Sequence, residues 1–417
     1  MAELKLNINK RLLRDLRRRI EEVLMENIVP FWLAYSVDEE NDGFWGRVSN
    51  ENVPVRNAPK GLILNSRILW TFSVLYQKYR EEKFLVMAER AWQYLLKYFW
   101  DGRFGGMYWL VNAFGDVADD KKKMYGQAFT IFAMSEYVKV TGKKNVLQRA
   151  IDIFELMLRH NYDRVNGGFL EASGRDWSAV ADMRLSEKDL NAEKSMNTHL
   201  HIMEAFTAFY RIWPDAMLKN LLTEVTQNFL QHVFNEQTGH LNLFFDRQWQ
   251  VLSKAISFGH DIEASWLLQE TLNVLNDETL SEQGKRVAEQ LAENTLRDGM
   301  SADYAIFKEK MDDGFLVPVL EWWQQAEAAV GFAYAYLLTG RDYFWEAAVK
   351  AWNFIEKHLI NEQYGEWYYE VDIKGRPNLN SYKVSEWKGP YHNSRACIEL
   401  LKCVAKLREG LDELVSK

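Results

Sequence analysis

Two kinds of helical pattern alternate along the chain. In segments 62–79 (LILNSRILWTFSVLYQKY) and 196–213 (MNTHLHIMEAFTAFYRIW), apolar residues occur on all sides of the predicted helix. The segments that follow them, 82–100 and 216–234, carry a clearer polar stripe. The first pattern is typical of a buried inner helix, and the second of an outer helix with one face in solvent. The sequence therefore predicts helix pairs, each with an inner and an outer member.

Short segments that combine glycine with aromatic or aliphatic residues separate these pairs. They begin at Gly43, Gly106, Gly168, Gly239 and Gly365. Their spacing is about 63 residues, except for one interval of twice that length, so a degenerate copy is expected near Gly299 in GMSADY. Six repeats of helix, turn, helix and hairpin predict an all-α fold, an (α/α)6 barrel with short β-hairpins at one end. We expect one domain over residues 1–417; an open solenoid is the alternative, but it requires polar terminal repeats that the sequence lacks.

Composition and charge exclude several classes of protein. Hydrophobic residues make up 47% of the chain and aromatic residues 14%, which supports a large core and excludes low-complexity disorder. The net charge is −8, and the basic run RLLRDLRRR at 11–19 is typical of a solvated helix face, so nucleic acid is not an expected partner. The sequence shows neither a secretory signal nor a long apolar run, so we expect a cytoplasmic protein with no membrane partner. Cys397 and Cys403 are expected to be free thiols.

Polar residues recur near the start of each predicted inner helix. They are Arg67, Tyr125, Asn197, His199, His201, His260, Glu263, Glu327 and His392. Equivalent positions in a closed ring of repeats point toward one axis, so these side chains are expected to line a single pocket at one end of the barrel. His199 lies two residues from His201 on the same helix and therefore points elsewhere, so we leave it out of the site.

Three kinds of chemistry fit this set of side chains. Histidines beside a carboxylate are possible metal ligands, but the HExxH spacing of zinc enzymes is missing. A glycosidase uses two carboxylates and aromatic platforms, yet it needs no group of histidines. Proton transfer beside a carbonyl group does need them, because imidazole titrates near neutral pH, and Arg67 is suited to stabilising an enediolate. A purely structural interpretation of GHDIEASWLL also exists, in which Asp261 caps the helix, Glu263 suits its positive end and His260 is a hydrogen-bonded neighbour.

Several motifs resemble those of the cellobiose 2-epimerases, within the N-acylglucosamine 2-epimerase superfamily. They are RNAPKGLILNSRILWTFS, KSMNTHLHIMEA, ISFGHDIEASWLL, EWWQQAEAAVGF, GEWYYEV and WKGPYHNSRAC, in order along nearly the whole chain. The resemblance implies an isomerase that works without a redox cofactor, and from the residue pattern we expect no metal ion either. Its implied partner is a β-1,4-linked disaccharide such as cellobiose or lactose, whose reducing-end glucose is epimerised to mannose. Ring opening and proton transfer through an enediolate are the implied steps.

The resemblance also implies roles for individual residues. His260 and His392 match the acid/base pair of the family, and His201 matches a third histidine linked to ring opening. The residues expected around the sugar are Arg67, Tyr125, Asp189, Asn197, Glu263, Trp322, Trp323, Glu327 and Trp387. The assignment of Asp189 depends on the resemblance alone, since aspartate is common in turns. Gln324 departs from the WWPQAE pattern of relatives and alters the helix entry beside the tryptophans.

Some alternatives stay open at this point. The N-acylglucosamine branch shares GHxxExxW and a late FHxxR pattern but lacks the MNTHLH histidines, and mannose isomerases are similar more loosely. A monosaccharide epimerase, a mannose isomerase and an (α/α)6 glycosidase are therefore the alternative functions, and either a monomer or a weak homodimer fits the sequence. His201 and His392 are about three repeats apart, on opposite sides of a six-repeat ring, whereas His260 and His392 are about two repeats apart. Spacing alone thus favours His201 with His392 as the facing pair, and the resemblance favours His260 with His392.

Overall fold

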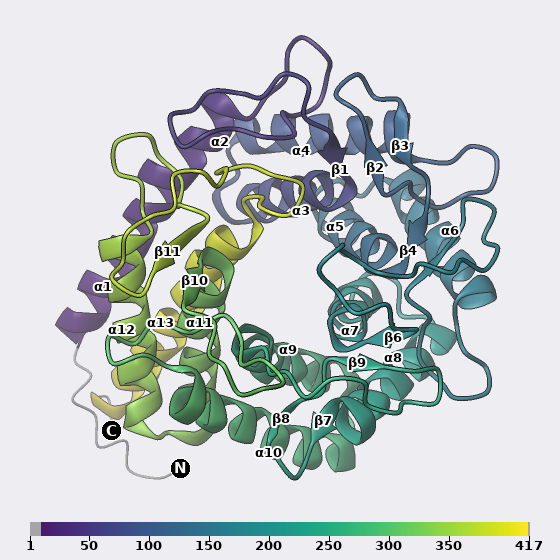
Figure 1. Ribbon diagram of the computed structural model, residues 1–417. Coiled ribbons are helices and arrows are strands. Elements are labelled where there is room, and N and C mark those ends of the chain that lie inside the picture. Colours follow the sequence, from purple (N-terminus) through teal and green to yellow (C-terminus); the bar gives the residue numbers. More distant parts are fainter. Residues whose placement is uncertain (1–9, 416–417) are drawn as a thin grey trace.

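The computed structural model describes residues 10–415, and within this range six inner helices surround a common axis (Figure 1). The inner helices are α3 (Leu62–Tyr79), α5 (Met124–Thr141), α7 (Met196–Tyr210), α9 (Phe258–Leu275), α11 (Trp322–Thr339) and α13 (Tyr391–Val415). Each packs against the next, and α13 packs against α3, so the ring is closed and the open solenoid is excluded. The fold is an (α/α)6 barrel, as predicted.

The outer helices form a second layer around this ring. They are α1 (Lys10–Glu22), α4 (Glu82–Tyr94), α6 (Lys144–His160), α8 (Ala216–Asn228), α10 (Glu278–Asn294) and α12 (Asp342–His358). Short π-helical turns extend α1, α4, α8 and α10; these are η1 (Val23–Ile28), η2 (Leu95–Phe99), η3 (Phe229–Val233) and η4 (Thr295–Gly299), and α2 (Val29–Tyr35) follows η1. No helix of residues 10–415 is both long and apolar enough to cross a membrane.

Burial separates the two layers as the hydrophobic pattern predicted. In α5, every residue from 124 to 137 is buried, because this helix is surrounded by neighbours. Its outer partner α6 buries one stripe at helical spacing, consisting of Val146, Ala150, Ile153, Phe154 and Met157. The polar face of α6 is left to solvent.

The first helix of the chain completes the ring beside the last. Helix α1 packs against α13 through a stripe that includes the buried residues Leu13, Leu16 and Ile20 (Figure 1). The arginines of its basic run lie mainly on the exposed face, as expected, and Arg19 pairs with Glu356 of α12. The sixth inner helix therefore takes its outer partner from the opposite end of the described chain.

A β-bridge recurs in each of the six repeats after the outer helix or its π-helical extension. The bridged pairs are Val37 with Phe44, Trp100 with Met107, Tyr162 with Phe169, Phe234 with Leu241, Met300 with Ile306, and Ile360 with Trp367. The copy expected near Gly299 is therefore present. Gly106 and Gly168, with φ of 72° and 74°, show why glycine marks these turns, since L-residues with side chains rarely adopt such angles.

Short antiparallel strands also join neighbouring repeats. The pairs between repeats are β1 (Lys60–Gly61) with β2 (Leu110–Val111), β4 (Lys122–Lys123) with β5 (Ala172–Ser173), β6 (Lys194–Ser195) with β9 (Phe244–Phe245), and β10 (Val319–Glu321) with β11 (Glu370–Asp372). Within a repeat, β2 also pairs with β3 (Val117–Asp119), and β7 (Phe234–Asn235) pairs with β8 (His240–Leu241). Strands β1, β4, β6 and β10 directly precede inner helices, so this end of the barrel is where the inner helices begin. The sequence predicted the hairpins but not the pairing between repeats.

Buried ion pairs fix the start of three inner helices. Each joins a lysine two residues before the helix to an aspartate of the preceding bridged turn: Lys60 to Asp38 at 2.8 Å, Lys122 to Asp101 at 3.1 Å, and Lys194 to Asp163 at 3.1 Å. The six side chains are 0 to 1% exposed, so losing either partner leaves an uncompensated charge in the interior. These pairs hold the first turns of α3, α5 and α7, which carry candidate site residues.

Candidate active site

The three candidate histidines meet at the end of the barrel where the inner helices begin. His260 of α9 and His392 of α13 both contact the ring of Trp323 on α11, with ring centroids 4.7 and 5.6 Å apart. His201 of α7 lies against Tyr125 of α5, at 5.0 Å between centroids. We call His201, His260 and His392, together with Glu204, Glu263, Glu327 and Arg395, the histidine cluster.

His201 is held by a carboxylate of its own helix. Its Nδ1–H donates to Oε2 of Glu204 at 2.8 Å, and both side chains are buried. Burial lowers the pKa of His201, although Glu204 opposes the shift. Burial alone raises the pKa of Glu204, but Arg395 and His201 outweigh it and lower that pKa below its ordinary value. His201 is therefore a neutral imidazole at neutral pH, and the lone pair on Nε2 is left to act as a base.

His392 has a similar partner on a neighbouring helix. Its Nδ1–H donates to Oε1 of Glu327 at 2.7 Å, and Trp266 donates from its indole nitrogen to Oε2 of the same carboxylate at 3.0 Å. Burial and the nearby charges of Arg67 and Arg395 hold the pKa of His392 well below its ordinary value. The unprotonated Nε2 makes His392 a second candidate base.

His260 is held differently. Its Nδ1 lies 2.6 Å from Oγ of Ser257, the residue that precedes α9. Burial and the neighbouring His201 lower the pKa of His260 to about 3, with Glu327 opposing them. A hydroxyl group can donate or accept, so this partner does not impose one tautomer on the ring.

A buried arginine that the sequence analysis missed connects these groups. Arg395 donates to Glu204, to Glu263 and, at 2.6 Å, to Glu327, so it joins the carboxylates of three inner helices. The hydroxyl of Tyr391 also donates to Glu204 at 2.6 Å. The spacing of His201 to Glu204 and of His392 to Arg395, three residues in each case, was the available signal.

Glu263 is a buried carboxyl group that lies next to a second one, that of Glu327. Burial and the neighbouring Glu327 raise the pKa of Glu263, which favours the protonated acid. Its Oε1 accepts from Arg395, whereas its Oε2 is buried and has no hydrogen-bond partner. It is therefore the one carboxylate oxygen of the cluster that has no hydrogen bond.

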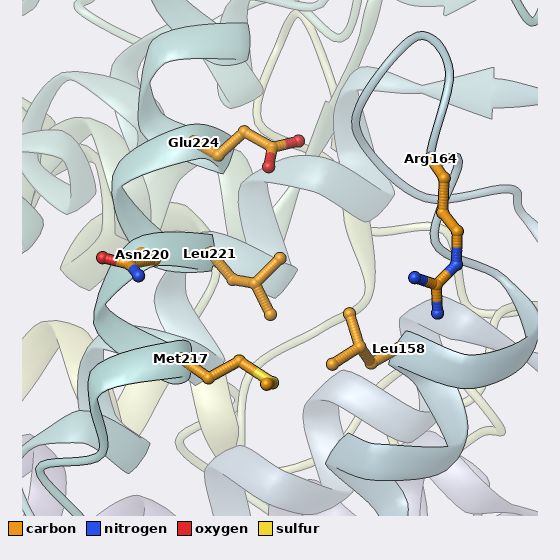
Figure 2. Close-up of a pocket in the computed structure, with 6 residues that line it drawn as sticks. All are labelled: Leu158, Arg164, Met217, Asn220, Leu221 and Glu224. Atoms are coloured by element: carbon orange, nitrogen blue, oxygen red, sulfur yellow. The ribbon is translucent and has the colours of Figure 1, made fainter.

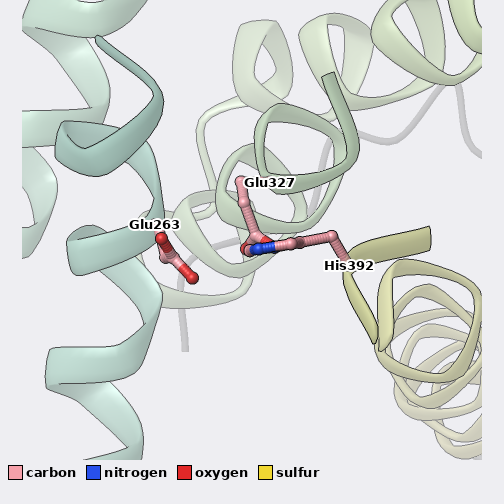
Figure 3. Close-up of side chains that lie close together, drawn as sticks. All are labelled: Glu263, Glu327 and His392. Carbon is pink, nitrogen blue, oxygen red and sulfur yellow. The ribbon is translucent and has the colours of Figure 1, made fainter. Parts of the chain in front are cut away.

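The donor set of the cluster does not favour a metal ion. Ligand atoms of Glu263, Glu327 and His392 lie within 4.8 Å of one another (Figure 3). However, the guanidinium of Arg395 already donates to both carboxylates, and the Nδ1–H of His392 donates to the same Glu327 oxygen. Arg395 therefore supplies the positive charge that a cation would bring, so the three residues fit an arginine-bound network better than a metal site.

Several residues expected around the sugar adjoin the cluster. Arg67 donates to the backbone oxygen of Trp387 and, at 3.2 Å, to the hydroxyl of Tyr125. The ring of Trp387 lies 6.0 Å from that of Tyr125, measured between centroids. Asn197 is partly buried at the start of α7, and its Oδ1 has no partner. The contacts of Arg67, Tyr125 and Trp387 connect α3 and α5 to the loop before α13.

The two adjacent tryptophans have different surroundings. The indole nitrogen of Trp323 donates to Glu321 at 2.7 Å, and its ring faces the histidines. Trp322 is buried, its ring lies 4.6 Å from that of Tyr369, and it meets His392 at a more distant 6.2 Å. Gln324 donates to the backbone oxygen of Lys308.

The remaining candidates have structural contacts. Asp189 accepts from the backbone nitrogen of Ser186 at 2.8 Å, as a turn-forming aspartate does. His199 donates from Nδ1 to the backbone oxygen of Ser195 and accepts at Nε2 from the backbone nitrogen of Phe169, which agrees with leaving it out of the site.

Asp261 does not cap its helix. It accepts from Nδ1 of His240 at 2.7 Å and from the backbone nitrogen of Leu241 at 3.0 Å, both in strand β8. The structural interpretation of GHDIEASWLL is therefore wrong for Asp261, because its carboxylate turns toward the hairpin.

Two hollows lie away from the histidines. A groove of about 330 Å³ on the outer layer runs between α6 and α8, lined by Leu158, Arg164, Met217, Asn220, Leu221 and Glu224 (Figure 2). Its position between outer helices separates it from the candidate site. A second hollow of about 200 Å³ lies among the later turns of the inner helices and has Glu204 and Arg395 in its wall.

Comparison with known proteins adds a family assignment to this geometry. Residues 43–396 match the family model of N-acylglucosamine 2-epimerase (GlcNAc 2-epimerase). The chain is 40% identical over 387 residues to a cellobiose 2-epimerase from Bacteroides fragilis, covering 93% of this chain and 98% of that one. It is 35% identical over 391 residues to the cellobiose 2-epimerase of Dictyoglomus turgidum, covering 94% and 99%. The solved structure of cellobiose 2-epimerase from Spirochaeta thermophila matches with a TM-score of 0.91 and 33% identity, over 96% of this chain and all of the other.

Proposed function

The chain belongs to the N-acylglucosamine 2-epimerase family, and on that basis we propose that it inverts C2 of the reducing-end glucose of β-1,4-linked disaccharides. Cellobiose would give glucosyl-mannose, and lactose would give epilactose. The observation that carries the proposal is the contact of two neutral histidines, His260 and His392, with one tryptophan ring, Trp323. His201 supplies a third base on the neighbouring helix α7.

Ring opening is the first step of the proposed reaction. A closed hemiacetal has no acidic proton on C2, so the aldehyde has to form first. The free Nε2 of His201 suits this step because Glu204 holds the opposite nitrogen as Nδ1–H. Nε2 takes the proton from the anomeric hydroxyl as the ring bond breaks.

Proton transfer at C2 follows. One of His260 and His392 removes the C2 proton, a planar enediolate forms, and the other histidine returns a proton to the opposite face. Each positioned acid or base contributes on the order of 10²- to 10⁴-fold to the rate. Arg67 and the protonated form of Glu263 are suited to stabilising the enediolate oxygens. Asn197, Trp322, Trp387, Tyr125, Glu327 and Asp189 complete the proposed sugar site.

A glycosidase is the less favoured function. It requires one carboxylic acid and one carboxylate at the scissile bond, both free to act. In the histidine cluster, both carboxylate oxygens of Glu204 and both of Glu327 accept hydrogen bonds, so only Glu263 has an oxygen without a partner and a second free carboxyl group is missing.

Incubation with lactose tests the proposed function. We expect anomeric NMR signals of epilactose, together with a slower ketose by-product from the same enediolate. Free galactose would instead identify a glycosidase, and unchanged lactose and cellobiose would contradict the proposal. Exhaustive chelation should leave turnover unchanged, since we propose an enzyme without a metal ion or redox cofactor; loss of activity that added zinc or manganese restores would contradict that part.

The organisation of the enzyme is part of the same proposal. We place it in the cytoplasm as a monomer or weak homodimer, and residues 1–417 act as one domain. Every inner helix packs between two others, so limited proteolysis should release no stable half. A soluble, folded fragment of three repeats would contradict the single domain.

A further inference from the structure

The hollow of about 200 Å³ among the later turns of the inner helices lies on the side of the histidine cluster where those helices end. We call it the rear cavity. Its wall includes the exposed side chains Gln77, Lys139, Arg211 and Lys402, from the ends of α3, α5 and α7 and from α13. The cavity is therefore open to solvent, and it is large enough for several water molecules.

An aromatic layer separates most of the rear cavity from the histidine cluster. Trp70 stacks on Phe132 at 5.6 Å between ring centroids, and its ring meets Tyr391 edge-on at 4.9 Å. Two polar side chains, Glu204 and Arg395, line the inner end of the cavity beside these rings. Both also belong to the histidine cluster, so the layer is interrupted by polar groups at this point.

Glu204 is the carboxylate of the cluster that both contacts a histidine and lines the rear cavity. Its Oε2 accepts from His201 at 2.8 Å, and its side chain is 5% exposed. Glu263 and Glu327 are each 1% exposed and do not line the rear cavity. Among the three carboxylates bound to Arg395, only Glu204 therefore joins a candidate base to the solvent behind it.

We infer that Glu204 is a positioning residue that passes protons between His201 and water in the rear cavity. This inference rests on the proposed function. During ring opening, Nε2 of His201 takes the proton from the anomeric hydroxyl, the C1–O5 electron pair goes to the ring oxygen, and a solvent water protonates that oxygen and becomes hydroxide. The Nδ1 proton of His201 then passes to Oε2 of Glu204 and on to water in the cavity, and this released proton neutralises the hydroxide in bulk solvent. Ring closure reverses each transfer, so His201 exchanges its proton behind the bound sugar.

Chemical rescue tests this route. In Glu204→Ala, we expect kcat to fall by about tenfold or more, and formate should restore it by entering the space of the lost carboxylate. Because formate arrives through the rear cavity, rescue should persist at saturating disaccharide. The matched control is Glu327→Ala, which removes the equivalent partner of His392 but not a wall of the rear cavity. It should show no rescue at saturating sugar.

A second variant keeps Glu204 and narrows the cavity. Val74 lines the rear cavity on α3, so Val74→Phe should slow turnover and increase its solvent deuterium isotope effect. Val138→Phe on α5, outside the cavity wall, is the control and should leave the isotope effect unchanged. Adding Val74→Phe to Glu204→Ala should also abolish rescue by formate.

Three outcomes decide the inference. Rescue of Glu204→Ala at saturating sugar, blocked by Val74→Phe, supports it. Rescue that competes with the sugar, or that is equal in Glu327→Ala, overturns the inference while leaving the proposed function intact. A wild-type chain that fails to epimerise cellobiose and lactose overturns both.

Discussion

His392 and His260 lie against the same tryptophan ring, but the protein holds them by different means. His392 donates to Glu327, and the network of Arg395 ties that carboxylate to two other inner helices. His260 contacts the hydroxyl of Ser257 at the start of its own helix. The network fixes His392 in one tautomer, whereas the hydroxyl leaves His260 free to exchange donor and acceptor roles. We therefore interpret His392 as the more rigid base and His260 as the more adaptable one.

Replacing either histidine should give the largest effect. We expect His260→Asn and His392→Asn each to lower kcat for epimerisation by about 10²- to 10⁴-fold, because each removes one face of proton transfer. In D2O, one variant should still exchange deuterium into the glucose-type substrate, and the other into the mannose-type product supplied as substrate. NMR of the C2 position measures both.

His201→Asn is the control for that experiment. If ring opening is its role, it should slow both directions alike, because that step precedes either abstraction. One-sided exchange in His201→Asn, with His260→Asn slowing both directions, would instead make His201 and His392 the facing pair, as the repeat spacing suggested.

Removing the negative charge of Glu327 should give the second-largest effect on kcat. In Glu327→Gln, the amide can donate to Nδ1 of His392 and so favour the wrong tautomer, and Arg395 loses one of its carboxylates. We expect kcat to fall by about 10- to 100-fold with a smaller change in KM. Steady-state kinetics by NMR checks the split, and a kcat within twofold of wild type would show that the network does not set the state of His392.

The pH dependence of stability separates His260 from another histidine, His240. The folded-state pKa of His260 is lowered to about 3 by burial, so between an unfolded value of about 6.5 and pH 3 the unfolded chain binds a proton that the folded chain does not. As the pH decreases through that window, the free energy of unfolding should decrease by at most ~1.4 kcal/mol per pH unit. The decrease should be smaller than this limit because the ring is partly exposed. His260→Asn should therefore flatten the dependence of the melting temperature on pH below 6.5.

His240 should behave in the opposite way. Burial lowers its pKa, but its bonds to Asp261 and Asp298 outweigh burial and raise it overall. Its contribution is therefore complete below pH 6.5 and is lost as pH rises through the folded-state value. His240→Asn should destabilise the protein more at pH 6 than at pH 9 in thermal melts; an equal loss at both values would contradict this assignment.

The smallest effect should come from the hydroxyl partner. Ser257→Ala removes one hydrogen bond to His260, so we expect a loss of about 0.5–1.5 kcal/mol, or about two- to tenfold in kcat. If Ser257→Ala slows turnover as much as Glu327→Gln, the two histidines are equally dependent on their partners and the distinction drawn between them fails.

The sequence predicted the inner and outer helix layers better than it predicted the buried ion pairs between separate segments. All-round burial of residues 124–137 and the stripe on α6 follow from local periodicity, which any helix displays in its own sequence. Lys122 and Asp101 carry no such signal, because isolated charged residues are normally exposed and only the closed ring buries this pair.

The same limit applies to the candidate site. His201, His260 and His392 occupy similar positions in their repeats. The sequence therefore predicted that they line one pocket, since equivalent positions share a height in the barrel. The contact of Glu204 with Arg395 depends on two helices from distant parts of the chain. Periodicity places each of them on its helix but does not show that they meet.

The pairing of α1 with α13 has a consequence for how the protein is made. A ribosome synthesises α1 before the other described helices and α13 after them, so the apolar stripe of α1 emerges long before its permanent neighbour. Until then the nascent barrel has an open seam, with Leu13, Leu16 and Ile20 uncovered by their final partner. His392 and Arg395 arrive on that same last helix, so the nascent chain gains its complete histidine cluster only when the seam can close.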